Sequence, residues 1–315
     1  MTGLKLKTGA GTYLFAVTAI LLWGMSYIWS DQLLRKGIPV EYFVLVRIFA
    51  AALILLLFNL LLKLDLRIKS RRDGALFVLL SAFEPFIYFI CETYGIKLTE
   101  SPTYSALIVA STPIFSVLFA FFFLREKMTL LNVIGIIVCL AGIVLVTISA
   151  STTGKYFTLG VILLLVAVFS EVGHATCVKS LGVKGYHPAV IVMYQFFIGS
   201  LMMLPLFLTR GLRDFEPSLY LSWEVFKPIL SLALFCSSMA FSLWAACIKA
   251  LGVAKSSIFL AMIPAVTALA GFILGQEILT SMQWLGIAVA TFGVVLTQLN
   301  ISLGAGKRGG ASLRS

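Results

Sequence analysis

Two groups of charged and polar side chains lie inside long apolar runs of this 315-residue sequence. The stretch FEPFIYFICE carries Glu84, Tyr88 and Glu92 at a spacing of four, which places all three on one face of a helix. Glu171 and His174 stand three apart in another apolar run, so both can face the same way. Such groups bind a substrate, a cation or a proton, or they fix helix packing through hydrogen bonds, and the sequence leaves both readings open.

A third charged residue, Arg47, lies inside an apolar run rather than at its end. Its expected depth lies between those of Glu92 and Glu84, and we expect an ion pair with one of them, because an isolated buried charge costs several kcal/mol. The alternative is that the guanidinium binds a substrate carboxylate through two parallel hydrogen bonds. Pro85 cannot donate to the carbonyl of Ser81, which predicts a bend beside Glu84.

The elements that position these residues are predicted to be membrane-spanning helices. The chain is 60% hydrophobic and 12% charged, about half the charged fraction of a soluble domain. The apolar runs are long enough to cross a bilayer, and they do not alternate with polar residues as membrane strands do. The sequence therefore predicts an all-α membrane protein with ten transmembrane helices, at residues 13–30, 42–62, 74–94, 103–124, 130–149, 159–179, 189–208, 228–247, 257–275 and 283–300.

The net charge of +11 serves as an orientation signal. With a cytoplasmic N-terminus, 16 of the 24 Lys and Arg residues fall in cytoplasmic segments and seven in outer segments. The positive-inside rule then places both termini in the cytoplasm, as expected for a multi-pass protein of the cytoplasmic (inner) membrane. We expect membrane lipid, with anionic headgroups near residues 67–72, and no nucleic acid as a partner.

The chain repeats itself. A gap-free shift of 151 positions lays residues 105–147 on residues 256–298 with 13 of 43 positions identical, proline, glutamate and glycine among them. We expect a cytoplasmic N-terminus at 1–12, a first five-helix repeat at 13–150, a second at 155–300 and a flexible cytoplasmic tail at 301–315. Because five is odd, the second repeat enters the membrane inverted, an arrangement typical of secondary transporters with a substrate site near the midplane.

This pattern resembles the drug/metabolite transporter superfamily, in its EamA-type ten-span class. The resemblance rests on Trp23-Gly24, on Pro39 with Arg47, and on two hairpins that read S-T-P-I-F…F-L-R-E-K-M-T and M-I-P-A-V…L-G-Q-E-I-L-T. It implies an exporter or exchanger of small metabolites with a cavity lined chiefly by spans 1, 3, 4, 6, 8 and 9, and with spans 5 and 10 as scaffold. The sixth span departs from the pattern, since it has no counterpart of the Trp-Gly pair.

Two prolines, Pro113 and Pro264, fall at matching depths in spans 4 and 9. Each leaves a carbonyl unpaired one turn earlier, at Val109 and Leu260. Bends at equivalent places in two halves indicate a hinge or gate, and a fixed packing kink is the alternative.

The sequence also predicts where the helices of spans 5 and 10 begin. Thr129 and Thr280 are expected N-caps of spans 5 and 10, and Thr280 forms a capping box with Gln283. Glu126 and Glu277 are expected to complement the positive N-termini of these two helices. Glycines in spans 5 and 10 are expected to permit close helix contact: Gly135, Gly142, Gly286 and Gly293.

The sequence predicts a secondary transporter of small amphipathic metabolites that works by alternating access, with amino acids and their relatives as the best substrate class. The proposed binding residues are Glu84, Tyr88, Glu92, Arg47, Trp23, Tyr27, Tyr104, Glu171, His174 and Trp244, and the proposed hinge residues are Pro85, Pro113 and Pro264. A multidrug or organic-cation exporter is the alternative, and a lipid-carrier flippase or a membrane-embedded enzyme is a weaker one. Protons are a candidate coupling ion, and the oligomeric state is monomer or homodimer.

Catalytic and metal chemistry are not expected. No nucleophile–base constellation or phosphate loop occurs in the sequence, and the two histidines are far apart without a thiol cluster. The five cysteines form no C-x-x-C pair, so they are expected to pack as small apolar residues. We therefore predict no enzyme activity, no cofactor and no metal site.

Overall fold

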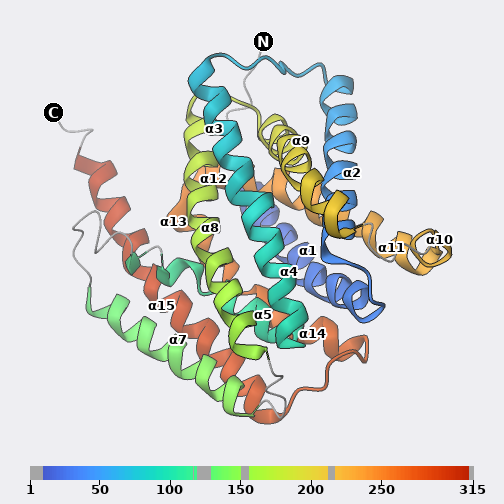
Figure 1. Ribbon diagram of the computed structural model, residues 1–315. Helices are drawn as coiled ribbons and strands as arrows, with labels where there is room; N and C mark the ends of the chain where they lie inside the picture. Colours follow the sequence, from blue (N-terminus) through green and yellow to red (C-terminus); the bar gives the residue numbers. More distant parts are fainter. Residues whose placement is uncertain (1–9, 116, 119–128, 150–155, 212–216, 312–315) are drawn as a thin grey trace.

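The computed structural model describes residues 10–115, 117–118, 129–149, 156–211 and 217–311, and this part of the chain is all-helical (Figure 1). The all-α prediction is confirmed. In chain order the helices and the wider helical turns (η) are α1 (Ala10–Arg35), α2 (Val40–Leu61), α3 (Arg71–Ser81), η1 (Ala82–Ile87), α4 (Tyr88–Thr99), α5 (Pro102–Val109), α7 (Leu130–Ser149), α8 (Phe157–Val183), α9 (Pro188–Leu206), η2 (Phe207–Gly211), α10 (Pro217–Tyr220), α11 (Trp223–Ser231), η3 (Leu232–Ala240), α12 (Phe241–Leu251), α13 (Val253–Leu260), α14 (Ile263–Ile273) and α15 (Ser281–Ala311).

Eight helical segments are long and apolar enough to cross a membrane, and they correspond to expected spans 1 to 3 and 5 to 9. The fourth expected span lies partly outside the described residues. The tenth corresponds to a shorter apolar stretch, Ser281–Thr297, within α15. The chain is thus a multi-pass membrane protein, while the count of ten and the side of the termini stay predictions.

Local side-chain chemistry sets the starts of α7 and α15 as the sequence predicted. Thr129 N donates to Asn132 Oδ1 (2.9 Å), and Asn132 N donates back to Thr129 Oγ1 (3.3 Å). Thr280 N likewise donates to Gln283 Oε1 (2.8 Å), and Gln283 N donates to Thr280 Oγ1 (3.3 Å). Both pairs satisfy backbone donors that a helix leaves free at its N-terminus.

The two proline breaks are confirmed. Helix α5 ends at Val109 and α13 ends at Leu260, the two residues whose carbonyls the prolines were expected to free. The Val109 carbonyl accepts a hydrogen bond from Thr112 Oγ1 (2.7 Å). Pro264 lies in the first turn of α14, where a missing N–H has no consequence for the helix.

Helices α7 and α15 form a pair along one edge of the molecule (Figure 1). A Cβ at Gly142 would lie 2.3 Å from Ala290 N, and a Cβ at Gly293 would lie 2.3 Å from Cys139 N. Only glycine lets the two backbones approach this closely, which confirms the predicted role of these glycines. The pair joins the last helix of the first repeat to the last helix of the second.

Several other helix pairs also join the two repeats. Helix α4 runs along α8, α2 packs along α9, and α1 packs against α12 and α14 (Figure 1). Each of these contacts joins a helix of the first repeat to one of the second. The interior between the repeats is therefore where the charged residues of both repeats can meet.

Candidate functional site

A cavity of about 40 Å³ lies between the two repeats. A buried water needs roughly 10–15 Å³ measured in this way, so the cavity has room for a few water molecules. Its walls come from spans 1, 2, 3, 6, 8 and 9, and the residues are Trp23, Ser26, Tyr27, Arg47, Glu84, Tyr88, Phe89, Glu92, Glu171, Phe241, Leu260 and Ile263. Span 2 contributes Arg47, which the resemblance did not imply, whereas the expected wall from span 4 lies partly outside the described residues.

The break in the third span holds Glu84. Its backbone is extended (φ −144°, ψ 123°) between two helical segments, and the residue is 2% exposed. The flanking residues are fixed by glycines of the second repeat, because a Cβ at Gly173 would lie 2.7 Å from the Phe83 ring and a Cβ at Gly199 would lie 2.4 Å from Pro85 Cγ. Ser170 Oγ also donates to the Phe83 carbonyl (2.6 Å). Packing from α8 and α9 therefore sets the position of this carboxylate.

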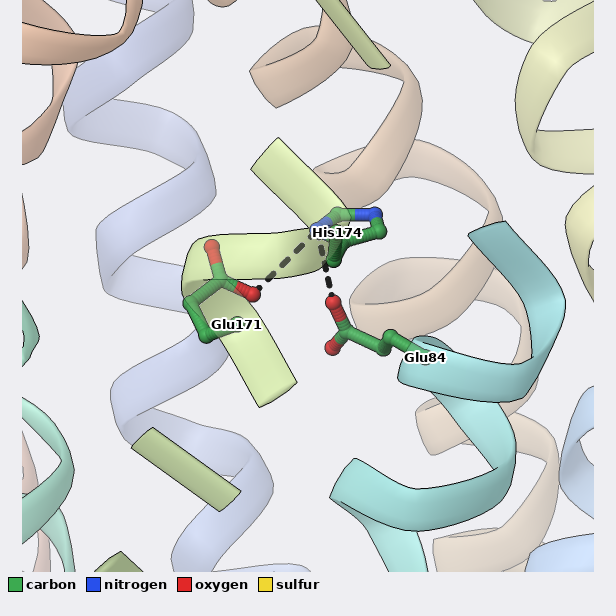
Figure 2. Close-up of side chains that lie close together, drawn as sticks. All are labelled: Glu84, Glu171 and His174. Carbon is green, nitrogen blue, oxygen red and sulfur yellow. Dashed lines mark ion pairs between the residues drawn. The ribbon is translucent and has the colours of Figure 1, made fainter. Parts of the chain in front are cut away.

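Figure 2 shows Glu84 meeting Glu171 and His174 across the repeat boundary. His174 Nδ1 lies 2.9 Å from Glu84 Oε2 and 3.2 Å from Glu171 Oε2. His174 Nε2 lies 3.3 Å from Gln195 Oε1 on α9. One carboxylate or imidazole atom from each of Glu84, Glu171 and His174 lies within 4.8 Å of the other two, a spacing at which they could share a cation. We call these three residues the triad.

The sequence-based prediction that Arg47 forms an ion pair with Glu84 or Glu92 is wrong. No carboxylate oxygen in the described part of the chain lies within 4.0 Å of its guanidinium. Its Nε donates to Ser237 Oγ (2.7 Å), and its Cζ lies 4.3 Å from the centre of the Phe89 ring. These contacts leave the terminal guanidinium nitrogens without a protein hydrogen bond among the described residues, in a side chain that lines the cavity. Helix packing places Arg47 beside an aromatic ring and a hydroxyl, where it can bind a carboxylate from a ligand.

The predicted stripe on the third span does face the cavity. Glu84, Tyr88 and Glu92 all line it, and the Tyr88 hydroxyl donates to Glu92 Oε1 (2.9 Å). Trp23 and Tyr27 of α1 also line it, as expected. Trp23 Nε1 donates to the Cys236 carbonyl (3.2 Å), which fixes the indole against the eighth span.

Three proposed binding residues lie outside the cavity lining: His174 of the triad and two aromatic residues. Tyr104 accepts a hydrogen bond from Thr147 Oγ1 (3.1 Å) and packs on Phe157. Trp244 is 2% exposed and lies behind Trp23, with the two ring centres 5.3 Å apart. We leave both aromatic residues out of the proposed site, since aromatic composition alone did not tell a cavity wall from a packing layer.

At one end of the bundle, a carboxylate of the second repeat, Glu277, bonds to the first repeat. Glu277 accepts hydrogen bonds from the Ser101 and Thr103 hydroxyls and from Thr103 N (3.3 Å). It therefore complements the N-terminus of α5 rather than that of α15, and the sequence-based expectation for Glu277 is wrong. Glu126, its counterpart in the first repeat, lies outside the described residues.

A second inter-repeat cluster closes the opposite end of the bundle. Asp73 of α3 forms an ion pair with Lys184 and accepts from the Tyr186 hydroxyl (3.0 Å). The Tyr186 hydroxyl in turn accepts from Lys69 N (2.8 Å). Contacts between the two repeats therefore occur at both ends of the bundle, with the cavity between them.

The other histidine, His187, takes no part in the triad. It caps α9, where Ala189 N donates to its Nδ1 (3.3 Å). Partial burial and the nearby Lys249 ammonium lower the pKa of His187, so it is neutral at physiological pH.

Sequence reasoning missed several partners that complete the site: Ser237, Gln195, Phe89 and Phe241. Serine, glutamine and phenylalanine inside apolar helices carry no positional signal, because each type also occurs in ordinary packing. The Asp73 cluster was missed as well, since Asp73 looks like an ordinary acidic residue in the first turn of a helix.

Comparison with known proteins shows that nearly the whole chain matches one protein family. The sequence pattern of the EamA-like transporter family matches residues 10–148 and 158–299. The uncharacterized transporter YetK of Bacillus subtilis is 25% identical over 299 residues, which cover 94% of this chain and 89% of that protein. A probable terminal-alkyne amino-acid exporter of Streptantibioticus cattleyicolor is 26% identical over 240 residues, which cover 74% of this chain and 76% of that protein.

A solved crystal structure shares the fold. It superposes with a TM-score of 0.68 at 16% identity and covers 92% of this chain and 98% of that one. At this identity the likeness concerns the arrangement of the helices and not the chemistry of the site.

Proposed function

Because this chain belongs to the EamA-like transporter family, we propose that it is a secondary transporter that exports or exchanges small amphipathic metabolites, with amino acids and their relatives as its substrate class. The observation that carries this proposal is the cavity itself. It presents an arginine with unengaged donors and three carboxylates between two repeats that are joined at both ends. Relatives and family are transporters, which argues against an enzyme.

The cavity chemistry suits a zwitterion. The free donors of Arg47 match a substrate carboxylate, which guanidinium binds through two parallel bonds. Glu84 and Glu171 can receive the ammonium group, and Trp23 and Phe241 offer an aromatic wall for an apolar side chain. One distant relative is named as an amino-acid exporter, which agrees with this substrate class.

Transport requires the joined ends of the bundle to open in turn. A cavity of about 40 Å³ must also widen to take a metabolite. The breaks before Pro113 and Pro264 and the break at Pro85 are the places where helices can bend without losing further hydrogen bonds. We propose these three prolines as hinges of an alternating-access cycle between two inverted repeats in the inner membrane.

Counterflow in proteoliposomes tests this proposal. Vesicles loaded with one unlabelled amino acid at a time are diluted into a trace of the same labelled amino acid, with EDTA present to remove metal ions. We expect accumulation for at least one amino acid, its loss in Glu84→Gln, and its retention in the control His187→Gln. Equal counterflow in Glu84→Gln and the unmodified protein would remove Glu84 from the site.

An organic-cation exporter is the second candidate, and one observation favours it. Among the described residues, three carboxylates but a single guanidinium line the cavity, together with several aromatic rings. Lipophilic cations tested in the same vesicles separate the two functions, because a cation exporter should take them up and should not need Arg47.

The coupling ion and the oligomeric state stay proposals. If protons are exchanged, an imposed pH gradient should drive amino-acid movement without any substrate gradient. Light scattering coupled to size-exclusion chromatography should give one or two chains per detergent micelle. A pH gradient without effect would indicate uncoupled exchange.

A further inference from the structure

Three acceptor atoms converge in the interior of the protein: Glu84 Oε2, Glu171 Oε2 and His174 Nδ1. Glu84 and His174 are each 2% exposed, and Glu171 is 9% exposed and reaches the cavity. No lysine or arginine in the described part of the chain lies within 4.0 Å of either carboxylate. Among the described residues, the two buried carboxylates therefore face one imidazole and no lysine or arginine within 4.0 Å.

The ring nitrogen of His174 that faces the two carboxylates has no hydrogen-bond partner among the described residues. Glu84 Oε2 lies 2.9 Å from His174 Nδ1, and neither atom has a hydrogen-bond partner in the described part of the chain. Gln195 Oε1 lies 3.3 Å from the other ring nitrogen, and it accepts a hydrogen bond from Nε2 in the tautomer that carries its proton there. Nδ1 then presents its lone pair toward the two carboxylates. An imidazole whose far N–H is held by an oxygen acceptor is the usual state of a metal-ligating histidine.

Two of the three spacings fit ligands of a transition metal, and the third, between the two carboxylates, is within 4.8 Å. Bonds of about 2.0–2.2 Å in tetrahedral or octahedral geometry place neighbouring ligand atoms about 2.9–3.6 Å apart. The two contacts of His174 Nδ1 are 2.9 and 3.2 Å.

We propose that Glu84, Glu171 and His174 bind a divalent transition-metal ion, with water from the cavity completing its coordination. One imidazole and two carboxylates suit Zn²⁺ or Mn²⁺, whereas Ca²⁺ requires six to eight oxygen ligands. The ion joins the third span of the first repeat to α8 of the second. It also occupies the carboxylates that would receive a substrate ammonium, so metal binding should inhibit exchange. The binding itself does not depend on the proposed transport function.

Titration calorimetry of the EDTA-treated full-length protein with Zn²⁺ alone tests the site. We expect one Zn²⁺ per chain, and an affinity about 100-fold or more lower in His174→Gln and Glu171→Gln. Gln195→Ala should lower the affinity about 10–100-fold, as loss of a histidine-orienting acceptor does. His187→Gln and Glu224→Gln, which change the other histidine and an exposed glutamate at one end of the bundle, should bind as the unmodified protein does.

X-ray absorption at the zinc edge supplies the second readout. We expect nitrogen and oxygen ligands with one imidazole and no sulfur. All five cysteines are free, so sulfur ligands would reveal an adventitious thiol site and overturn the proposal. Absence of binding, or equal binding in the triad variants with unchanged melting temperature, would overturn it too. Because counterflow is measured in EDTA, failure here leaves the proposed transport function standing.

Discussion

The substitution Gly199→Ala should disable transport although Gly199 is not among the residues that line the cavity. A Cβ on residue 199 would lie 2.4 Å from Pro85 Cγ and 2.6 Å from Pro85 Cδ. Ordinary contacts of this kind begin at 3.4 Å, so the Pro85 ring or α9 must move by roughly 1 Å. A proline ring cannot rotate away as a flexible side chain can, and the displacement passes directly to Glu84. Misplacement of a binding group by about 1 Å lowers rates roughly 100-fold.

Counterflow and thermal unfolding in detergent measure the two consequences separately. We expect exchange to fall about 100-fold, with a destabilisation of only about 1–2 kcal/mol, since overpacking costs about 1–3 kcal/mol and alanine is the better helix former. Gly182→Ala is the matched control, because its Cβ would lie 3.5 Å from Lys249 Cγ, an ordinary contact. Wild-type exchange in Gly199→Ala would refute the inference that packing against α9 sets the position of Glu84.

Three further predictions concern the scaffold, the end of the bundle that holds Glu277 and the substrate. Gly142→Ala should destabilise the α7–α15 pair by about 1–3 kcal/mol and lower the melting temperature, because the added Cβ would meet backbone atoms of α15. The control Gly11→Ala has open space around its Cβ and should leave the melting temperature unchanged or higher. Thr103→Val removes a hydrogen-bond donor to Glu277 and should weaken the contact between the repeats at that end of the bundle by about 1–2 kcal/mol. We expect a longer spin-label distance between α5 and α14. An unchanged distance distribution would contradict the role of this contact. Arg47→Lys should raise the KM for an amino acid about 10–100-fold through loss of a charge-assisted hydrogen bond and leave cation uptake unaffected; an unchanged KM would exclude Arg47 as the carboxylate partner.

The amino-acid sequence by itself determined the features that depend on neighbouring residues. Long apolar runs fixed the membrane class and the places of eight spans. Proline chemistry fixed the helix ends at Val109 and Leu260, and threonine caps fixed the starts of α7 and α15. Each of these follows from hydrogen bonds within one or two turns, so a single sequence suffices to predict it.

Only the tertiary structure decided which charges meet. Glu84 faces His174, Arg47 faces Ser237 and Phe89, and Glu277 faces α5, although the sequence favoured an Arg47 ion pair and a local partner for Glu277. A membrane helix that is apolar on nearly every side has no stripe to indicate which face turns inward. Its rotation and depth are set by packing against distant helices, at contacts such as Gly199 against Pro85, and a rotation of one residue would present a different side chain to the cavity.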